Sequence, residues 1–238
     1  MDSVKEVVKE ITTRLGKLFS AELGIRLQKG SSAKIFKWFV ASLLFGARIS
    51  ETIAKNTYRE FERDDLLDPE KILKRGWEGL VFTLDKGGYV RYDYKTADKF
   101  LEVMGNLKKE YNGDLNLLHD KSAGARDLEE RLKNLGKGIG DVTVNIFLRE
   151  LRGIWEKANP PPQELTLTAA KNLGLLENTK KVESNLEELL DIWKKNRVKG
   201  YGFPNFETAL LRIGKDYCRR KKCSNCPAKE LCEAVKRQ

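Results

Sequence analysis

The residues best suited to chemistry are four cysteines near the end of the chain. Cys218, Cys223, Cys226 and Cys232 all lie in the last twenty-one residues, within DYCRRKKCSNCPAKELC, and no cysteine precedes them. Four thiolates so close in the sequence can hold either a tetrahedral Zn²⁺ or a [4Fe–4S] cluster. Zinc sites usually carry two C-x₂-C pairs separated by a longer loop, whereas the spacing here is C-x₄-C-x₂-C-x₅-C. The spacing favours an iron–sulfur cluster, with zinc as the alternative.

The same cysteines could instead form two disulfides, which would require an oxidising compartment. The first residues, MDSVKEVVKE, show none of the features of a secretory signal, so we expect a cytoplasmic protein with reduced thiols. No segment approaches twenty uncharged apolar residues, so no membrane partner is expected either. The metal-centre interpretation is therefore preferred.

The charge balance indicates a polyanionic partner. The chain carries 45 Lys and Arg against 35 Asp and Glu, which gives a net charge of +10 and a pI near 9.3. Nucleic acid is the first candidate for such a partner. Charged residues make up 34% of the chain, and a composition rich in Lys and Glu is also typical of thermophilic proteins. The single histidine, His119, lies in a polar stretch and is expected in a loop rather than as a catalytic base.

The apolar residues recur at spacings of three and four, and clear alternating strand patterns are missing, which predicts an all-α fold. A polar segment from Asn112 to Arg126 and the break Asn159–Pro162 interrupt the pattern. Helices are expected at about residues 2–19, 32–46, 50–63, 69–75, 77–85, 94–111, 126–135, 141–156, 164–173, 181–195 and 205–216.

A glycine-rich turn joins two of these helices in the segment Leu132–Asn145, where Gly136, Gly138 and Gly140 alternate with other residues. Glycines permit positive φ angles and the close approach of a phosphate to backbone N–H groups at a helix start. Such a turn can hold a duplex backbone without reading its sequence. A glycine turn between antiparallel helices can also be purely structural.

The hairpin and the cysteine loop together resemble those of the helix-hairpin-helix (HhH-GPD) DNA glycosylase superfamily, in its endonuclease III and adenine glycosylase branch. The family hairpin, L-P-G-V-G-x-K-T-A-N, is similar to Gly138–Asn145, and Thr143 matches its threonine. The family cysteine loop, C-x₆-C-x₂-C-x₅-C, differs here only in a first spacing two residues shorter. Further similar segments are Phe39–Leu44, Gly87–Tyr89 with Lys95–Ala97, and Phe206–Gly214.

The resemblance implies two α-helical domains with a DNA cleft between them. A six-helix barrel ending in the hairpin would span residues 30–145, and a [4Fe–4S] cluster domain would comprise residues 1–29 and 146–238. The expected partner is damaged or abasic duplex DNA, bound by a monomer that is nucleoid-associated when on DNA. Expected DNA contacts are the three hairpin glycines, Thr143, Arg48 as the residue that fills the gap of an everted base, and the cations of the first cysteine loop: Arg219, Arg220, Lys221 and Lys222. This basic loop could also merely offset the charge of the thiolates.

The catalytic residues of the family are not where its pattern places them. The lyase lysine would stand at Val142, which cannot act as a nucleophile, and counting back from Leu173–Leu175 places the catalytic aspartate at Gln163, beside Glu164. Glu164 could replace the aspartate at its helix N-terminus, where the dipole favours a carboxylate. Lys137 or Lys95 could supply the amine.

Asp141 is a further acid, although as the first helical residue it could simply cap its helix. The sequence therefore predicts a base-excision repair enzyme, a DNA glycosylase or AP lyase with atypical catalytic residues. The alternative is a non-catalytic lesion-binding or structural DNA-binding protein.

Overall fold

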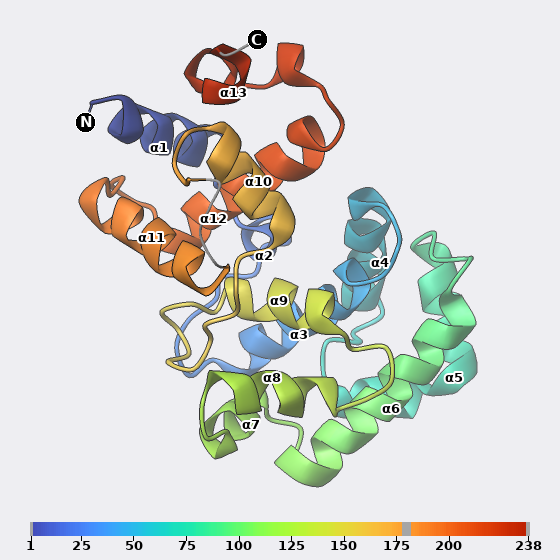
Figure 1. The fold of residues 1–238 in the computed structure, drawn as a ribbon. Helices are drawn as coiled ribbons and strands as arrows, with labels where there is room; N and C mark the ends of the chain where they lie inside the picture. The colour runs from blue at the N-terminus through green and yellow to red at the C-terminus, as the bar shows by residue number, and fades with distance from the viewer. Residues whose placement is uncertain (1, 178–181, 237–238) are drawn as a thin grey trace. The chain divides into compact units, whose positions relative to one another are not determined.

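The computed structural model describes residues 2–177 and 182–236, and in this part of the chain the regular structure is helical, without a β-strand (Figure 1). The all-α prediction is confirmed. The chain divides into two compact units: unit 1 contains Met1–Phe19 and Pro161–Gln238, and unit 2 contains Ser20–Pro160. Within the described ranges, no helix has the length and apolar character needed to cross a membrane.

Unit 2 is built around a central apolar helix, α3. Trp38, Val40 and Leu43 of this helix are fully buried, and α3 packs against α4, α7 and α9. A helix that is apolar on almost every side has to be enclosed by other elements, which explains this central position. The helices of the unit after the short α2 (Phe19–Glu22) are α3 (Ser32–Phe45), α4 (Glu51–Arg63), α5 (Pro69–Lys86), α6 (Asp93–Tyr111), α7 (Leu115–Lys121), α8 (Ala125–Lys133) and α9 (Asp141–Arg149).

The longest pair of packed helices in unit 2 is α5 with α6, which lie side by side (Figure 1). Gly76 has φ +69° and ψ 174° inside α5, so the helix is broken there. This break agrees with the two separate helices that the sequence predicts at 69–75 and 77–85. Only glycine adopts these angles without strain, and the chain changes direction directly before Trp77.

Unit 1 combines the N-terminal helix with the C-terminal third of the chain. Helix α12 packs against α1, α10 and α11, and its apolar face forms the centre of the core. The elements of the unit are α1 (Asp2–Leu15), α10 (Glu164–Asn172), α11 (Val182–Lys195), α12 (Phe203–Arg212), the π-helix η1 (Ile213–Cys218), the 3₁₀ turns η2 (Cys223–Asn225) and η3 (Lys229–Leu231), and α13 (Glu233–Lys236).

Gly214 brings η1 into close contact with α10. A Cβ at this position would lie 1.9 Å from the carbonyl oxygen of Leu165, which is a backbone atom that cannot move aside without displacing the helix. The absence of a side chain therefore fixes how closely η1 approaches α10, and with it the start of the cysteine segment at Cys218.

Three expectations about the elements need adjustment. The segment predicted as a polar loop contains α7, and His119 belongs to that helix with its ring stacked 4.9 Å from the ring of Trp155. Helix α9 ends at Arg149 rather than near residue 156. Glu150 then turns its buried carboxylate toward Ser20, whose backbone N–H donates to it across 3.0 Å.

The units also begin and end at different residues from the predicted domains, at 19/20 and 160/161 rather than 29/30 and 145/146. Residues 20–29 and 146–160 therefore belong to unit 2. The Ser20–Glu150 hydrogen bond joins these two segments to each other, and the contact of Trp155 with His119 joins the second segment to α7.

Candidate nucleic-acid interface and cysteine pocket

The glycine hairpin lies between α8 and α9 in unit 2, over residues 134–140. Gly138 has φ +85° and is exposed, and Gly140 is exposed as the N-cap residue of α9 with no atom near the position of a Cβ. Gly136 differs, because it is buried and a Cβ there would lie 2.7 Å from Cγ2 of Val103. Two of the three glycines therefore present backbone to solvent, and Gly136 instead lets the hairpin pack on α6.

The hairpin borders a pocket of about 430 Å³. Three elements form its wall: the turn after α3, the first half of α6 and the hairpin itself. The lining residues are Gly46, Ala47, Arg48, Tyr92, Lys95, Thr96, Asp98, Lys99, Glu102, Lys137 and Gly138. We call this the cationic pocket, because it contains four basic side chains and two acidic ones.

Both acidic residues of the cationic pocket are engaged by N–H donors. Glu102 accepts a hydrogen bond from the backbone N–H of Lys137 across 3.1 Å, which holds the hairpin against α6. Asp98 accepts one from the indole N–H of Trp77 across 2.9 Å. Because Arg48, Lys95, Lys99 and Lys137 outnumber the two carboxylates, the lining is basic on balance, as a phosphate site requires.

Lys99 is a residue that the sequence analysis missed. Its Nζ donates a hydrogen bond to the carbonyl oxygen of Leu43 across 3.0 Å, and burial lowers its pKa from 10.5 to about 8. Desolvation disfavours the charged ammonium, and no carboxylate compensates for it here. The pattern of lysines in the sequence gives no signal for this position, because the burial depends on the end of α3, 56 residues away.

The predicted contact and catalytic residues of unit 2 fall into two groups. Arg48, Lys95 and Lys137 are exposed and line the cationic pocket together with Gly138. Asp141 is exposed and pairs with Lys133 across 2.7 Å, so its carboxylate links α9 to α8; the N-cap residue is Gly140. Val142 is 57% exposed where the family would place its lysine.

Thr143 is placed differently from the expectation that it contacts DNA. Its side chain is 3% exposed and packs against Gly46, where a Cβ would lie 2.0 Å from the Thr143 hydroxyl oxygen. The hydroxyl therefore joins α9 to the turn after α3, and only its backbone could face a phosphate.

Glu164 is the first residue of α10 in unit 1 and is exposed. It follows Pro160–Pro162, as the sequence indicates, and Gln163 is the N-cap residue. The remaining catalytic candidates thus belong to different units: Glu164 to unit 1, and Lys95 and Lys137 to unit 2.

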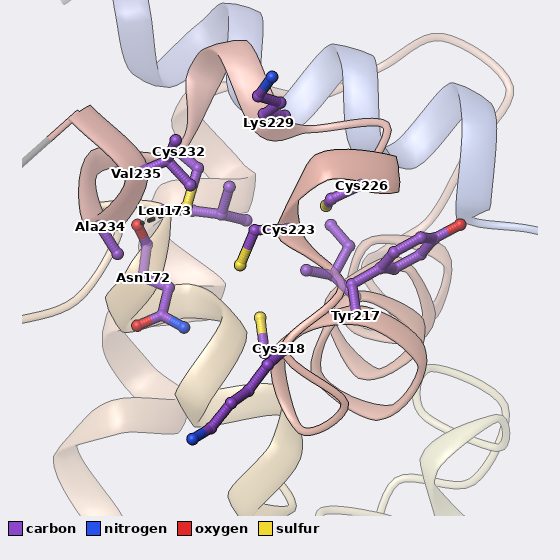
Figure 2. A pocket seen from close by; sticks show the side chains of 12 residues that line it. Asn172, Leu173, Tyr217, Cys218, Cys223, Cys226, Lys229, Cys232, Ala234 and Val235 are labelled. Carbon is purple, nitrogen blue, oxygen red and sulfur yellow. Dashed lines mark hydrogen bonds between the residues drawn. The ribbon is translucent and has the colours of Figure 1, made fainter. Parts of the chain in front are cut away.

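The four cysteines line one pocket in unit 1, with a volume of about 540 Å³ (Figure 2). They share it with Asn172 and Leu173 of α10 and with Tyr217 of η1. Figure 2 shows the side chains around a common space, with the sulfurs of Cys218 and Cys223 directed toward it. The cysteines are free thiols, and burial raises the pKa values of Cys218 and Cys226.

Four thiols around one pocket are the donor set of either group that the sequence left open, a [4Fe–4S] cluster or a zinc ion. Within residues 2–177 and 182–236, no three His, Cys, Asp or Glu side chains are close enough together to hold one metal ion. Zinc needs four sulfurs at about 2.3 Å from one centre, whereas a [4Fe–4S] cube separates its four thiolates. The structure shows four thiols around one space rather than a formed metal site.

The basic loop, Arg219–Lys222, begins where η1 ends. All four residues are exposed, and Lys221 also lines the cysteine pocket. Backbone hydrogen bonds from Arg219 to Gly214 (2.9 Å) and from Lys222 to Tyr217 (3.0 Å) anchor the loop. It thus has a defined backbone from which its cations extend into solvent.

Comparison with solved structures identifies the architecture. A structure of a thermostable thymine-DNA glycosylase matches with a TM-score of 0.58 and 16% identity, covering 100% of this chain and 98% of that chain. A trapped endonuclease III–DNA covalent intermediate matches with a TM-score of 0.55 and 18% identity, covering 85% of each chain. The chain has the fold that these endonuclease III and thymine-DNA glycosylase structures share.

A non-covalent endonuclease III–DNA complex is a third match with this fold, at a TM-score of 0.53 and 18% identity, covering 90% of this chain and 87% of that one. No family model matches the sequence, and no curated protein matches it either. The predicted HhH-GPD resemblance is confirmed at the level of the fold.

Proposed function

We propose that the protein acts in base-excision repair, as a DNA glycosylase, an AP lyase or both, on damaged or abasic duplex DNA. The observation that carries this proposal is the cationic pocket, in which Arg48, Lys95, Lys99 and Lys137 surround an exposed hairpin glycine. Hairpin backbone and clustered cations bind phosphates without reading sequence, which suits an enzyme that must act at any position in a genome. The structural neighbours, two of which are complexes with DNA, support the same choice.

The reaction requires the damaged nucleotide to leave the duplex, because its C1′ atom is inaccessible within the base stack. Arg48 is exposed on the turn between α3 and α4, at the edge of the cationic pocket. A guanidinium group can stack on bases and bond to the partner left without its base. We assign Arg48 to the gap that the damaged nucleotide leaves in the duplex when it swings out.

Lys99 is our candidate for the lyase amine, ahead of Lys137 and Lys95. An amine with a pKa of about 8 is neutral in a far larger share of the molecules near neutral pH than an ordinary lysine, whose pKa is about 10.4. The neutral amine would attack the aldehyde carbon C1′ of a ring-opened abasic sugar and form a C–N bond. Loss of water then gives a protonated imine, which borohydride reduces to a stable protein–DNA link.

Base removal also calls for a carboxylate that stabilises the cationic sugar, and we assign this role to Glu164. Its position at the N-terminus of α10 supports an ionised carboxylate through the helix dipole, and the three preceding prolines restrict the backbone. Glu164→Gln should then abolish release of the base while leaving binding of the same duplex intact.

The test of the whole proposal is incubation with duplexes that contain uracil, oxidised bases or an abasic site, followed by assays of strand scission and of borohydride-trapped adducts. We expect a trapped adduct with the abasic duplex that disappears in Lys99→Met and persists in Lys95→Ala and Lys137→Ala. An adduct that survives Lys99→Met would overturn the assignment of Lys99. Tight binding without product from any lesion would overturn the enzyme proposal itself.

That second outcome would support a non-catalytic lesion-binding protein, which the exposed Val142 favours, because it occupies the position of the family lysine. Such a protein should bind a duplex with a lesion more tightly than the matched undamaged duplex, and it should leave both strands intact.

A [4Fe–4S] cluster held by Cys218, Cys223, Cys226 and Cys232 is the proposed cofactor, and its role would be to join η1, η2 and η3 into one rigid segment. Iron without zinc in the anaerobically purified protein, with broad visible absorbance, would support it. Zinc without iron would replace the cluster with the zinc alternative.

A further inference from the structure

Unit 2 exposes a pair of aromatic rings that its own core does not use. Trp77 of α5 is 39% exposed and Tyr94 of α6 is 60% exposed, and their ring centroids lie 5.2 Å apart at 40° between planes. The other three tryptophans, Trp38, Trp155 and Trp193, are all less than 8% exposed. Contiguous aromatic surface in water is a candidate binding site, whereas a single exposed side chain needs no explanation.

The aromatic pair adjoins the cationic pocket. The Trp77 indole N–H donates to Asp98, which lines that pocket, and Tyr94 directly precedes Lys95, which lines it as well. The break at Gly76 places Trp77 at the start of a new helical segment. Side-chain hydrogen bonding and backbone geometry thus hold an aromatic surface beside a set of cations.

This combination of an aromatic surface and phosphate-binding cations suits single-stranded nucleic acid. Each base has an apolar face that stacks on an aromatic ring, and its backbone phosphate seeks a nearby cation. Inside a duplex both faces of a base are covered by its neighbours, so only an unpaired nucleotide can offer a free face to Trp77 or Tyr94. An apolar protein segment would gain nothing from the four cations next to the rings.

We propose that Trp77 and Tyr94 form a stacking site for an unpaired base, whose phosphate lies in the cationic pocket beside Lys95. The ligand is a single-stranded nucleotide that continues from a duplex, as in an overhang, a gap or a frayed end. The inference relies on the proposed function only in taking DNA as the ligand. It extends the substrate class from closed duplex to duplex with a single-stranded junction.

The test compares one blunt duplex with the same duplex carrying a three-nucleotide single-stranded overhang, both without lesions. We expect tighter binding of the overhang duplex, by roughly 5- to 100-fold, since stacking on one aromatic side chain contributes that order of affinity. Tryptophan fluorescence should be quenched by the overhang duplex and much less by the blunt one, because Trp77 is the exposed tryptophan.

Three variants make the test specific. Trp77→Ala and Tyr94→Ala should each lose most of the overhang preference, whereas Trp77→Phe should retain much of it, because a ring remains although the hydrogen bond to Asp98 is lost. The matched control is Phe82→Ala, since Phe82 is 56% exposed on the same helix, has the Lys86 ammonium 4.6 Å from its ring centre, and does not line the cationic pocket. Phe82→Ala should leave both affinities unchanged.

The outcomes separate this inference from the proposed function. Equal affinity of the wild-type protein for blunt and overhang duplexes, or an overhang preference that persists in both alanine variants, would overturn the stacking site while leaving duplex binding in place. Failure to bind either duplex would instead contradict the proposed function. The fluorescence comparison uses the unaltered protein, so it decides the question even where a variant does not fold.

Discussion

Lys99 Nζ donates a hydrogen bond to the carbonyl oxygen of Leu43 across 3.0 Å, and this contact connects the end of α3 with the lining of the cationic pocket. Leu43 lies in the last turn of α3, where backbone carbonyls have no partner within the helix. The amine therefore completes the end of α3 and faces the pocket at the same time. Its burial comes from this position, and so does its lowered pKa.

The pH dependence of adduct formation follows from that pKa. The trapping rate should rise as the pH increases through about 8, where the Lys99 ammonium loses its proton, and should level off above it. Trapping over pH 6.5–9.5 at constant ionic strength measures the midpoint. A trapping rate that still rises steeply at pH 9.5, without levelling off, would indicate an ordinary exposed lysine as the nucleophile.

The same group should affect stability with a defined sign. The folded pKa of Lys99, about 8, lies below the unfolded value of 10.5, so the unfolded chain binds more protons between these two values. The contribution of Lys99 to the free energy of unfolding should therefore increase as the pH rises from 8 to 10.5. Denaturant unfolding at pH 7.5 and pH 10 measures this effect. The free energy of unfolding should rise less between these pH values in Lys99→Met than in the wild type. An equal rise in both proteins would contradict the predicted sign.

A methyl group at Gly214 should destabilise unit 1. Gly214→Ala places a Cβ 1.9 Å from the Leu165 carbonyl oxygen, and relief requires η1 to move away from α10. A loss of about 1–3 kcal/mol in the free energy of unfolding is expected, as in other overpacked sites. Gly105→Ala on α6 is the control, because no atom lies within 4 Å of its Cβ position, and it should be neutral or stabilising. Equal thermal stability of the two variants would show that the contact is not restrictive.

Loss of one cysteine should remove the proposed cluster. Cys226→Ser leaves three thiols around the pocket, so the purified protein should lose its iron and its visible absorbance, and its thermal unfolding should shift to a lower temperature. Ser224→Ala is the control, because it changes an exposed residue in the same cysteine segment. This variant should retain the iron, the visible absorbance and the unfolding temperature of the wild type. Full iron content in Cys226→Ser would contradict a four-cysteine site.

The basic loop should contribute to DNA affinity through phosphates alone. Removing one phosphate contact lowers the slope of log affinity against log salt by about 1, irrespective of DNA sequence. Arg220→Ala should show this change in titrations of blunt duplex between 50 and 200 mM salt. Lys5→Ala is the control, an exposed cation on α1 in the same unit, and it should leave the slope unaltered. If both variants behave alike, the loop cations act only through net charge.

The regular features of the fold were predictable because they depend on local spacing. The apolar periodicity predicts α3, α4, α6 and the break at Gly76 within a residue or two, and the clustering of the cysteines predicts a common pocket. Helix α7 was missed because its polar composition hides the burial of Leu115 and Leu118.

The features that were not predictable depend on contacts distant in the sequence. Thr143 matches the family hairpin, but the turn at Gly46 removes its side chain from solvent. Lys99 looks like any other lysine until the end of α3 covers it. Residue type and spacing therefore predicted that the four cysteines lie together, whereas the exposure and the pKa of each side chain required the tertiary structure.

The packing of α1 against α12 also has a consequence for synthesis on the ribosome. Unit 2 is continuous from Ser20 to Pro160 and can begin to fold as soon as its last helix emerges. Helix α1 precedes unit 2 in the chain, yet the helix that covers its apolar face does not start until Phe203. The apolar face of α1 therefore stays uncovered in the nascent chain until α12 has been synthesised. During this interval, aggregation or chaperone binding would compete with the folding of unit 1.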